Sequence, residues 1–228
     1  MKRLFILLLM TFSLSAQTTR EVSIGFETEE LPGDDWRQWH AALKYGPVIG
    51  RVMHADRGEA SDEMFELEAY PRLAPKTYAY VAGAVSNDSV LYPDWRVGAE
   101  LYHGFGNGWE ASGGWRHLAF DEEVDLFTAS LGKYAGNWLL LGRAYHANDD
   151  TSWQASARRY FGDDGTYLGL RYGTGRDEIR SGVDVQSLER HEGVVEGLYI
   201  APSRWTLQGR AGTTDEGFLA ALAVGRRF

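Results

Sequence analysis

The chain has 228 residues, with 23 Lys and Arg against 32 Asp and Glu, and it contains no cysteine. An acidic balance disfavours a nucleic-acid partner, because phosphate backbones are bound by basic faces. Since cysteine is absent, no disulfide framework holds the fold together, and stability must come from secondary structure itself.

The first residues have the order of a secretory signal peptide. Lys2 and Arg3 precede a short apolar run, and the small residues Ser13-Leu-Ser-Ala16 follow it. The run is too short for a membrane-spanning helix, which needs about 20 apolar residues. We therefore predict cleavage after Ala16, which makes residues 1–16 the signal peptide. Residues 17–228 contain no linker and are predicted to form one domain.

Apolar and polar side chains alternate through the rest of the chain. The segment that begins at Trp95 has Val97 and Leu101 on the same face and Arg96 and Glu100 on the other. Because lipid offers no hydrogen-bond partner to the backbone, such strands cross a membrane only as a closed barrel. Period-two stretches bounded by turn residues predict a closed antiparallel up-and-down transmembrane β-barrel of fourteen strands, at 20–28, 36–46, 48–56, 62–73, 76–87, 95–105, 108–119, 124–135, 137–146, 151–162, 166–176, 190–200, 203–213 and 217–228.

Two of these segments, 48–56 and 190–200, alternate less cleanly, and loss of one hairpin would leave twelve strands. The connections form two classes: tight turns such as Gly46-Pro47 alternate with longer ones such as 56–61 and 177–189. Bacterial barrels have short periplasmic turns and longer outer loops. We therefore expect the longer connections to face outward and both termini to face the periplasm, and we expect no long constriction loop.

Tryptophans lie near the predicted strand ends, where a lipid-facing aromatic belt would place them: Trp36, Trp39, Trp95, Trp109, Trp138, Trp153 and Trp205. A soluble β-sandwich would use the same residues as its core. Small residues at outward positions, such as Ala111, Gly113 and Ala155, would fill such a core poorly. We therefore favour the membrane barrel.

Several motifs then resemble those of one family. They are Tyr92-Pro-Asp-Trp-Arg-Val-Gly-Ala-Glu-Leu-Tyr102, Glu110-Ala-Ser-Gly-Gly-Trp-Arg116 and Arg158-Arg-Tyr-Phe161, with related stretches at 68–80 and 130–137. Together they resemble the YaiO-type outer-membrane β-barrel family. The resemblance implies an outer-membrane barrel near envelope-polysaccharide functions, and it supplies no catalytic residue. The terminal Phe228 is similar to the signal read by the outer-membrane assembly machinery.

The polar face of the predicted strands carries charges of both signs. The lumen-lining candidates are Glu66, Glu68, Glu100, Glu110, Arg116, Arg143, Arg158, Arg171 and Arg210. Because an unpaired buried charge is costly, these groups will pair. They predict either a narrow polar pore or a salt-bridged interior that keeps the barrel rigid. Tyrosines on the same face suit stacking on sugar rings, although tyrosine is also common in strands: Tyr70, Tyr78, Tyr80, Tyr102, Tyr160 and Tyr167.

The predicted outer loops are acidic: Glu29, Glu30, Asp34, Asp35, Asp56, Glu59, Asp62, Asp121, Glu122, Glu123, Asp149, Asp150, Asp177, Glu178, Asp215 and Glu216. Carboxylates of this kind suit divalent cations shared with lipopolysaccharide. No loop has the ligand spacing of a dedicated calcium motif, so we predict no metal site and no cofactor.

An enzyme is the main alternative. His103 and His117 fall on the lipid-facing side, with Ser112 and Ser130 nearby in sequence, but no nucleophile elbow or metal-ligand pair accompanies them. We name no catalytic residue. The sequence favours an outer-membrane conduit or accessory for polar solutes or envelope polysaccharide, in contact with outer-membrane lipids and lipopolysaccharide. There are two alternatives: a lipid- or polysaccharide-modifying enzyme, and a structural or adhesive barrel that acts through its acidic loops.

Overall fold

The computed structural model describes residues 19–31, 33–87, 90–121, 123–147, 150–162, 165–176 and 189–228. The predicted signal peptide at residues 1–16 lies outside these described residues. Within them, no helix has the length and apolar character needed to cross a membrane.

The strands follow one another along the chain without an intervening helix in the described ranges. They are β1 (Arg20–Glu29), β2 (Trp36–Tyr45), β3 (Val48–Arg57), β4 (Ala60–Ala69), β5 (Arg72–Ala74), β6 (Thr77–Ser86), β7 (Trp95–Gly106), β8 (Trp109–Ala119), β9 (Glu123–Ala135), β10 (Trp138–Ala147), β11 (Asp150–Phe161), β12 (Thr166–Arg176), β13 (Glu189–Ile200), β14 (Trp205–Thr214) and β15 (Phe218–Arg227).

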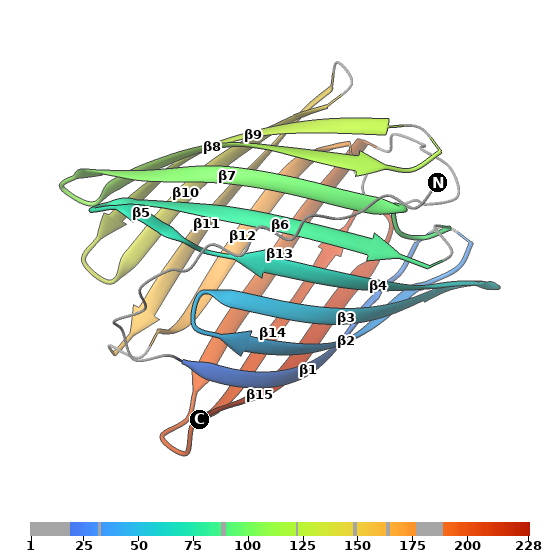
Figure 1. Cartoon of the computed structure of the whole chain (residues 1–228), viewed down its shortest axis with the longest axis horizontal. Coiled ribbons are helices and arrows are strands. Elements are labelled where there is room, and N and C mark those ends of the chain that lie inside the picture. Colours follow the sequence, from blue (N-terminus) through green and yellow to red (C-terminus); the bar gives the residue numbers. More distant parts are fainter. Residues whose placement is uncertain are drawn as a thin grey trace, which may run out of the picture.

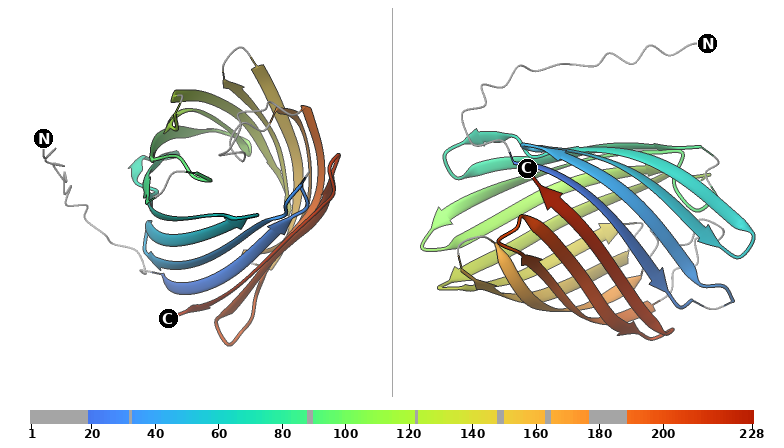
Figure 2. Two further views of the ribbon diagram at one scale, coloured as in Figure 1. Left: turned by 90° about the vertical axis from the view of Figure 1, so that its right-hand side faces the viewer. Right: turned by 90° about the horizontal axis from the view of Figure 1, so that it is seen from below.

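These strands form one antiparallel sheet that closes on itself (Figures 1 and 2). Strand β1 pairs with β2 on one side and with β15 on the other. Strands β4 and β5 both pair with β6, and Pro71, which has no backbone N–H, lies between them. They therefore act as one interrupted barrel strand, and the described residues form the fourteen-stranded barrel that the sequence predicts. Both weakly alternating segments are strands, so the twelve-stranded alternative is wrong.

The barrel has two different ends. Tight turns lie at the end that we call the turn end, where Lys76, Asn107 and Arg204 adopt positive φ angles. The backbone N–H of Phe228 donates to the Arg20 carbonyl over 2.9 Å, which places the last strand beside the first at this end. We call the opposite end the loop end. One connection there is shorter than predicted, because the pairing of β3 with β4 continues to the opposed residues 57 and 60.

The outward faces of the strands form an apolar surface. Ile24, Leu170 and Phe105 are each more than 60% exposed, as expected for side chains that face lipid. The expected tryptophan belt is wrong at one position. Trp36 faces the interior and is only 6% exposed, whereas Trp39 faces outward. The two residues are three positions apart, and side chains separated by an odd number of positions lie on opposite faces of a strand.

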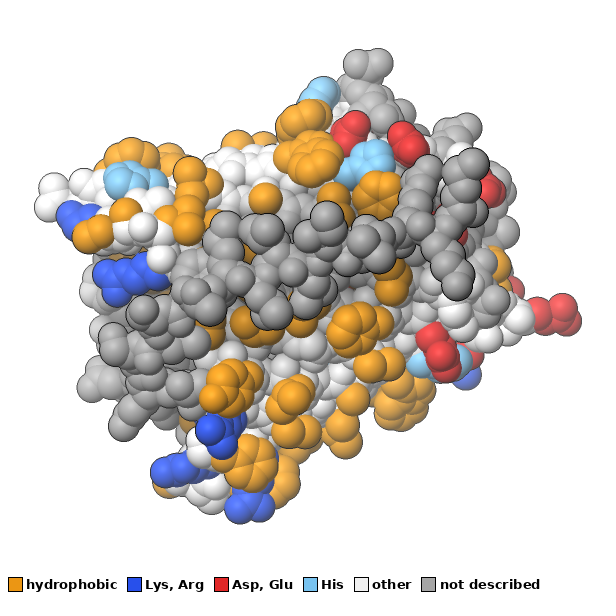
Figure 3. All heavy atoms as spheres, viewed as in Figure 1, with side chains coloured by type: hydrophobic (Ala, Val, Ile, Leu, Met, Phe, Trp, Pro, Cys, Tyr) orange, Lys and Arg blue, Asp and Glu red, His pale blue; other side chains and the backbone are white. Residues whose placement is uncertain are grey.

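The two rims of the outer surface carry different charges (Figure 3). At the turn end, basic side chains lie over aromatic rings in the pairs Arg20–Tyr45, Lys133–Trp109, Arg159–Trp138 and Arg226–Trp205. At the loop end, outward histidines contact polar or acidic partners in the pairs His54–Asp56, His117–Asp125 and His146–Thr151. Both rims combine aromatic and polar groups, which suits the interfaces of a membrane.

Candidate lumen site

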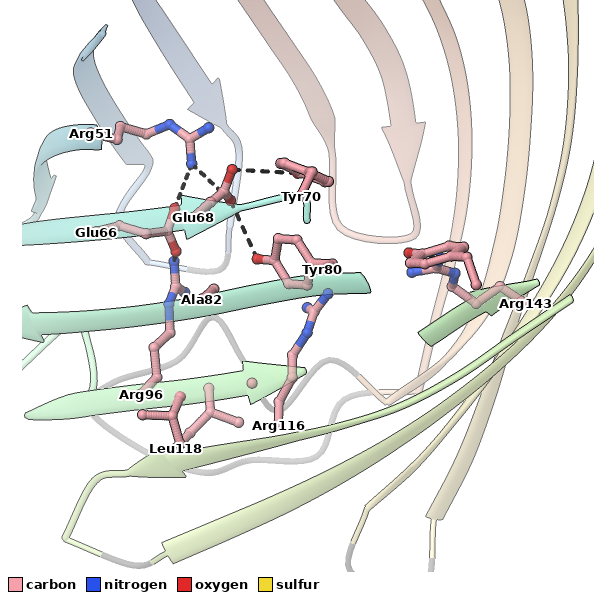
Figure 4. A pocket seen from close by; sticks show the side chains of 13 residues that line it. Arg51, Glu66, Glu68, Tyr70, Tyr80, Ala82, Arg96, Arg116, Leu118 and Arg143 are labelled. Carbon is pink, nitrogen blue, oxygen red and sulfur yellow. Dashed lines mark hydrogen bonds and ion pairs between the residues drawn. The ribbon is translucent and has the colours of Figure 1, made fainter. Parts of the chain in front are cut away.

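Strand register places charged and small residues in rows across the inner wall. The first row crosses four neighbouring strands. Arg51 of β3 lies opposite Glu66 of β4, which lies opposite Ala84 of β6, and Ala84 in turn lies opposite Arg96 of β7. Glu66 is 3% exposed and accepts a hydrogen bond from Arg51 Nη1 at 2.5 Å and another from Arg96 (Figure 4). The small Ala84 side chain leaves room for Arg96 to reach across β6. The buried carboxylate is therefore held between two guanidinium groups.

The second row lies two residues nearer the turn end and contains Glu68, Ala82, Gly98 and Arg116. The Glu68 carboxylate contacts Arg51 at 3.5 Å and accepts a hydrogen bond from the Tyr80 hydroxyl at 3.3 Å. The Tyr70 hydroxyl donates to the same carboxylate at 3.4 Å. Arg116 instead lies over the Tyr80 ring, with its Cζ 5.7 Å from the ring centroid.

A third group of contacts involves Glu100 and Arg143. Arg143 Nη2 donates to Glu100 Oε1 at 3.0 Å and to the Tyr102 hydroxyl at 3.2 Å. The Ser112 hydroxyl donates to the same glutamate oxygen at 2.5 Å. Tyr102 in turn stacks on Tyr78, with ring centroids 4.6 Å apart. The neighbouring aromatic rings are thus held in fixed positions by the ion pair and by each other.

These rows surround a cavity of about 420 Å³ inside the barrel. Its walls carry arginines, glutamates and tyrosines separated by small or apolar residues: Arg51, Glu66, Glu68, Tyr70, Tyr80, Ala82, Arg96, Val97, Gly98, Tyr102, Arg116, Leu118 and Arg143. The cavity therefore offers fixed cations, carboxylate acceptors and aromatic faces to a polar solute.

The predicted lumen residues divide between this cavity and the opposite wall. Glu66, Glu68, Arg116 and Arg143 line the cavity, and Glu100 contacts it through Arg143. Elsewhere the charges form separate pairs, namely Arg158–Glu196 at 2.6 Å, Arg171–Glu192 at 3.2 Å and Arg210–Glu27. Glu110 lies nearer the turn end and accepts a hydrogen bond from the Tyr78 hydroxyl at 3.1 Å.

Sequence reasoning missed two members of the site, Arg51 and Arg96. Arg51 interrupts the simple alternation of its segment, yet it has the same parity as the inward Met53. Arg96 lies on the polar face of its segment but was not among the selected candidates. Strict counting in steps of two from neighbouring inward residues would have found both.

The connection between β6 and β7 also contributes to the interior. It is one of the longer connections predicted from the sequence, and its described residues 91–93 are buried in the interior. Leu91 is 1% and Tyr92 6% exposed, and they form a cluster with the inward residues Trp36, Met53 and Met64. The Tyr92 ring packs edge-on against Trp36 at 5.9 Å, and its hydroxyl donates to Gln38 Oε1 at 2.8 Å. Burial raises the pKa of Tyr92 above its ordinary value.

Asp62 holds this inward loop in place. Its Oδ2 accepts the backbone N–H groups of Val90 at 2.8 Å, Leu91 at 2.6 Å and Tyr92 at 2.9 Å. The assignment of Asp62 and Glu29 to exposed acidic loops is therefore wrong, because they are 1% and 0% exposed. Both belong to strands that extend further than the alternation suggested, and their parity directs them inward.

The histidines and serines considered for an enzyme do not meet. Ser112 and Ser130 face the interior, where their hydroxyls are hydrogen-bonded to each other. His103 faces outward at the turn end and contacts Thr77 at 2.9 Å. His117 faces outward at the loop end, where its Nδ1 lies 3.0 Å from Asp125. No group of three or more potential metal ligands occurs among the described residues; Glu122, Asp149, Asp177 and Glu178 lie outside them.

Comparisons with known proteins agree with this architecture. Residues 37–178 match the model of a family described as the YaiO membrane beta barrel domain. Among solved structures, the outer membrane protein Omp33 of Acinetobacter baumannii has a TM-score of 0.56 and 11% identity, over 92% of this chain and 98% of that one. The COG4313 outer membrane channel of Pseudomonas putida F1 has a TM-score of 0.53 and 14% identity, over 94% and 97%.

A structure of the KdgM porin in complex with disordered oligogalacturonate has a TM-score of 0.52 and 8% identity, over 92% of this chain and 99% of that one. At these identities the likeness concerns the fold alone. No curated protein matches the chain. The protein is an integral outer-membrane β-barrel whose fold resembles those of porins and channels.

Proposed function

Because the chain belongs to the YaiO membrane beta barrel family, we propose that it is a narrow conduit for polar solutes or envelope polysaccharide. The observation that carries this proposal is the polar cavity enclosed by a complete barrel wall. In the proposed orientation, the turn end faces the periplasm and the loop end faces the exterior, as in other bacterial barrels.

The distribution of small residues favours a conduit over a merely rigid interior. The Arg96 and Arg116 side chains cross Ala84 and Gly98, whereas Ala82 lines the cavity between Glu68 and Gly98. An interior built only for rigidity would pair Arg116 with an acidic side chain and fill the space beside Ala82. Here the charges lie along the wall and leave space beside them, so a solute meets fixed charges of both signs.

We further propose that lipids and lipopolysaccharide of the outer membrane contact the apolar outer surface between the two aromatic rims. The assembly machinery of the outer membrane would recognise the terminal strand with Phe228. The outward rims and the inward cavity would thus serve different partners.

A planar-bilayer recording tests the conduit. Purified protein is expected to produce discrete conductance steps. Arg116→Glu is expected to shift the ion preference toward cations, because it reverses the charge of a cavity-lining group. Arg159→Glu is the matched control, since Arg159 lies over Trp138 on the outer surface. Silence of folded wild-type protein in every bilayer would refute the proposal.

A further inference from the structure

One cation in the cavity differs from the others. Arg51 and Arg96 pair with Glu66, and Arg143 pairs with Glu100. No carboxylate of the described residues forms a salt bridge with Arg116. Its guanidinium instead faces the Tyr80 ring, which leaves its hydrogen-bond donors for another partner.

The register explains why Arg116 remains without an acidic partner. In its row, Ala82 and Gly98 separate it from Glu68. The Arg116 side chain crosses Gly98 so closely that a Cβ there would lie 2.7 Å from Arg116 Cγ. Glu68 is meanwhile occupied by Arg51 and by the hydroxyl of Tyr80. The space between the Glu68 carboxylate and the Arg116 guanidinium is part of the cavity.

We propose that this cavity binds the carboxylate-bearing sugar ring of an acidic oligosaccharide, with Arg116 as the ligand of the carboxylate. The inference rests on the proposed conduit, whose solute it names. A planar guanidinium matches a carboxylate with two parallel hydrogen bonds. Tyr70, Tyr80 and Tyr102 line the same space and offer aromatic surface to the sugar ring, and their hydroxyl oxygens can accept hydrogen bonds from its hydroxyl groups.

The charge of the cavity favours a single negative charge on each sugar unit. Four arginines line it, and the three glutamates that contact them leave one positive charge in excess. One carboxylate neutralises this excess, whereas a dianion such as a phosphate monoester would leave one uncompensated negative charge in the cavity. The volume of about 420 Å³ is within the range of roughly 300–1,000 Å³ that is typical of small-molecule sites.

The test compares an acidic and a neutral oligosaccharide of equal length. A trimer of galacturonic acid and a trimer of galactose are added to single channels, and the concentration that blocks half of the current is measured. The acidic trimer is expected to block at a concentration about tenfold lower, as a charge-assisted contact predicts. Arg116→Gln is expected to remove this difference and Arg116→Lys to retain part of it. The outward Arg159→Gln should keep it in full.

Binding is also measured by titration calorimetry with the folded protein in detergent, which does not depend on conduction. Arg116-dependent binding in the absence of any conductance would support the site and refute the conduit. Equal block by both trimers in a conducting channel would overturn the site and leave the conduit. Block by inorganic phosphate as strong as that by the acidic trimer, and equally dependent on Arg116, would also overturn the assignment to a sugar.

Discussion

At the scale of single residues, the absence of a side chain at Gly98 allows the Arg116 side chain to lie flat against the inner wall. Gly98 faces Arg116 across the β7–β8 pair, and the arginine chain occupies the place where a Cβ would be. The same arrangement occurs on the opposite wall, where a Cβ at Gly169 would lie 2.9 Å from Arg158 Cγ. Glycine in a strand costs conformational entropy, so its presence here has a local packing reason.

We expect Gly98→Ala to lower single-channel conductance. The new Cβ would lie 2.7 Å from Arg116 Cγ and 3.3 Å from the backbone oxygen of Trp115, so the Arg116 side chain should shift toward the centre of the cavity, and the overpacking should lower stability by about 1–3 kcal/mol. Gly113→Ala is the control, because Gly113 lies on the outer face with no atom within 4 Å of the added Cβ. Conductance that is unchanged in Gly98→Ala would show that Arg116 does not border the path of ions.

At the scale of elements, the inward loop between β6 and β7 depends on one carboxylate. Asp62 accepts three backbone hydrogen bonds from it, and Trp36, Met53 and Met64 pack against its apolar residues. The loop narrows the interior near the loop end because its buried residues occupy space between β2 and β6. A local change at Asp62 should therefore affect the loop without opening the barrel.

We expect Asp62→Ala to release this loop. Hydrogen bonds to a charged acceptor contribute about 1.5–3 kcal/mol each, so the loss should make the amides at 90–92 exchange with solvent much faster. Mean conductance should rise and become noisier. Asp56→Ala, on the exposed side of β3, should change neither measurement. Retained amide protection at 90–92 in Asp62→Ala would contradict this role.

The strands and their facing follow from the sequence because both depend on local alternation. The segment 95–105 shows its inward and outward residues directly, and the structure agrees. The loop could not be foreseen, since Asp62 contacts residues 28 to 30 positions later in the chain. The same holds for the Arg51–Glu66–Arg96 contact, which requires the exact register of four strands. Alternation determines on which face a side chain lies, but it does not determine which residue lies opposite.

At the scale of the whole molecule, stability depends on closure. Strand β15 pairs with β1 from Glu21–Arg227 to Glu29–Leu219, so no sheet edge is left unpaired there. The described residues contain no cysteine that would hold the two strands together covalently. Closure is therefore maintained by backbone hydrogen bonds, together with the Arg227–Glu21 ion pair of 3.0 Å across the same seam.

We expect Val224→Pro to prevent closure. Val224 pairs with Ile24 on one side and Leu207 on the other, and proline removes a backbone donor and restricts φ. The variant should lose the fast-migrating band of a folded barrel in unheated SDS gels. Val224→Ala keeps the backbone N–H and should retain that band. A folded band in the proline variant would show that this part of the seam is dispensable.

The rows of paired residues across the inner wall restrict where insertions and deletions can occur in the chain during evolution. Each row joins residues from distant parts of the chain, for example Arg51 and Arg96 through Glu66. Deleting one codon within β4 would exchange the faces of every later residue in that strand, and its carboxylates would then meet hydrocarbon. The same deletion in an exposed connection at the loop end would leave the facing of both flanking strands unchanged. We therefore expect inherited length differences among related proteins to occur between strands, while strand lengths persist even where side chains diverge.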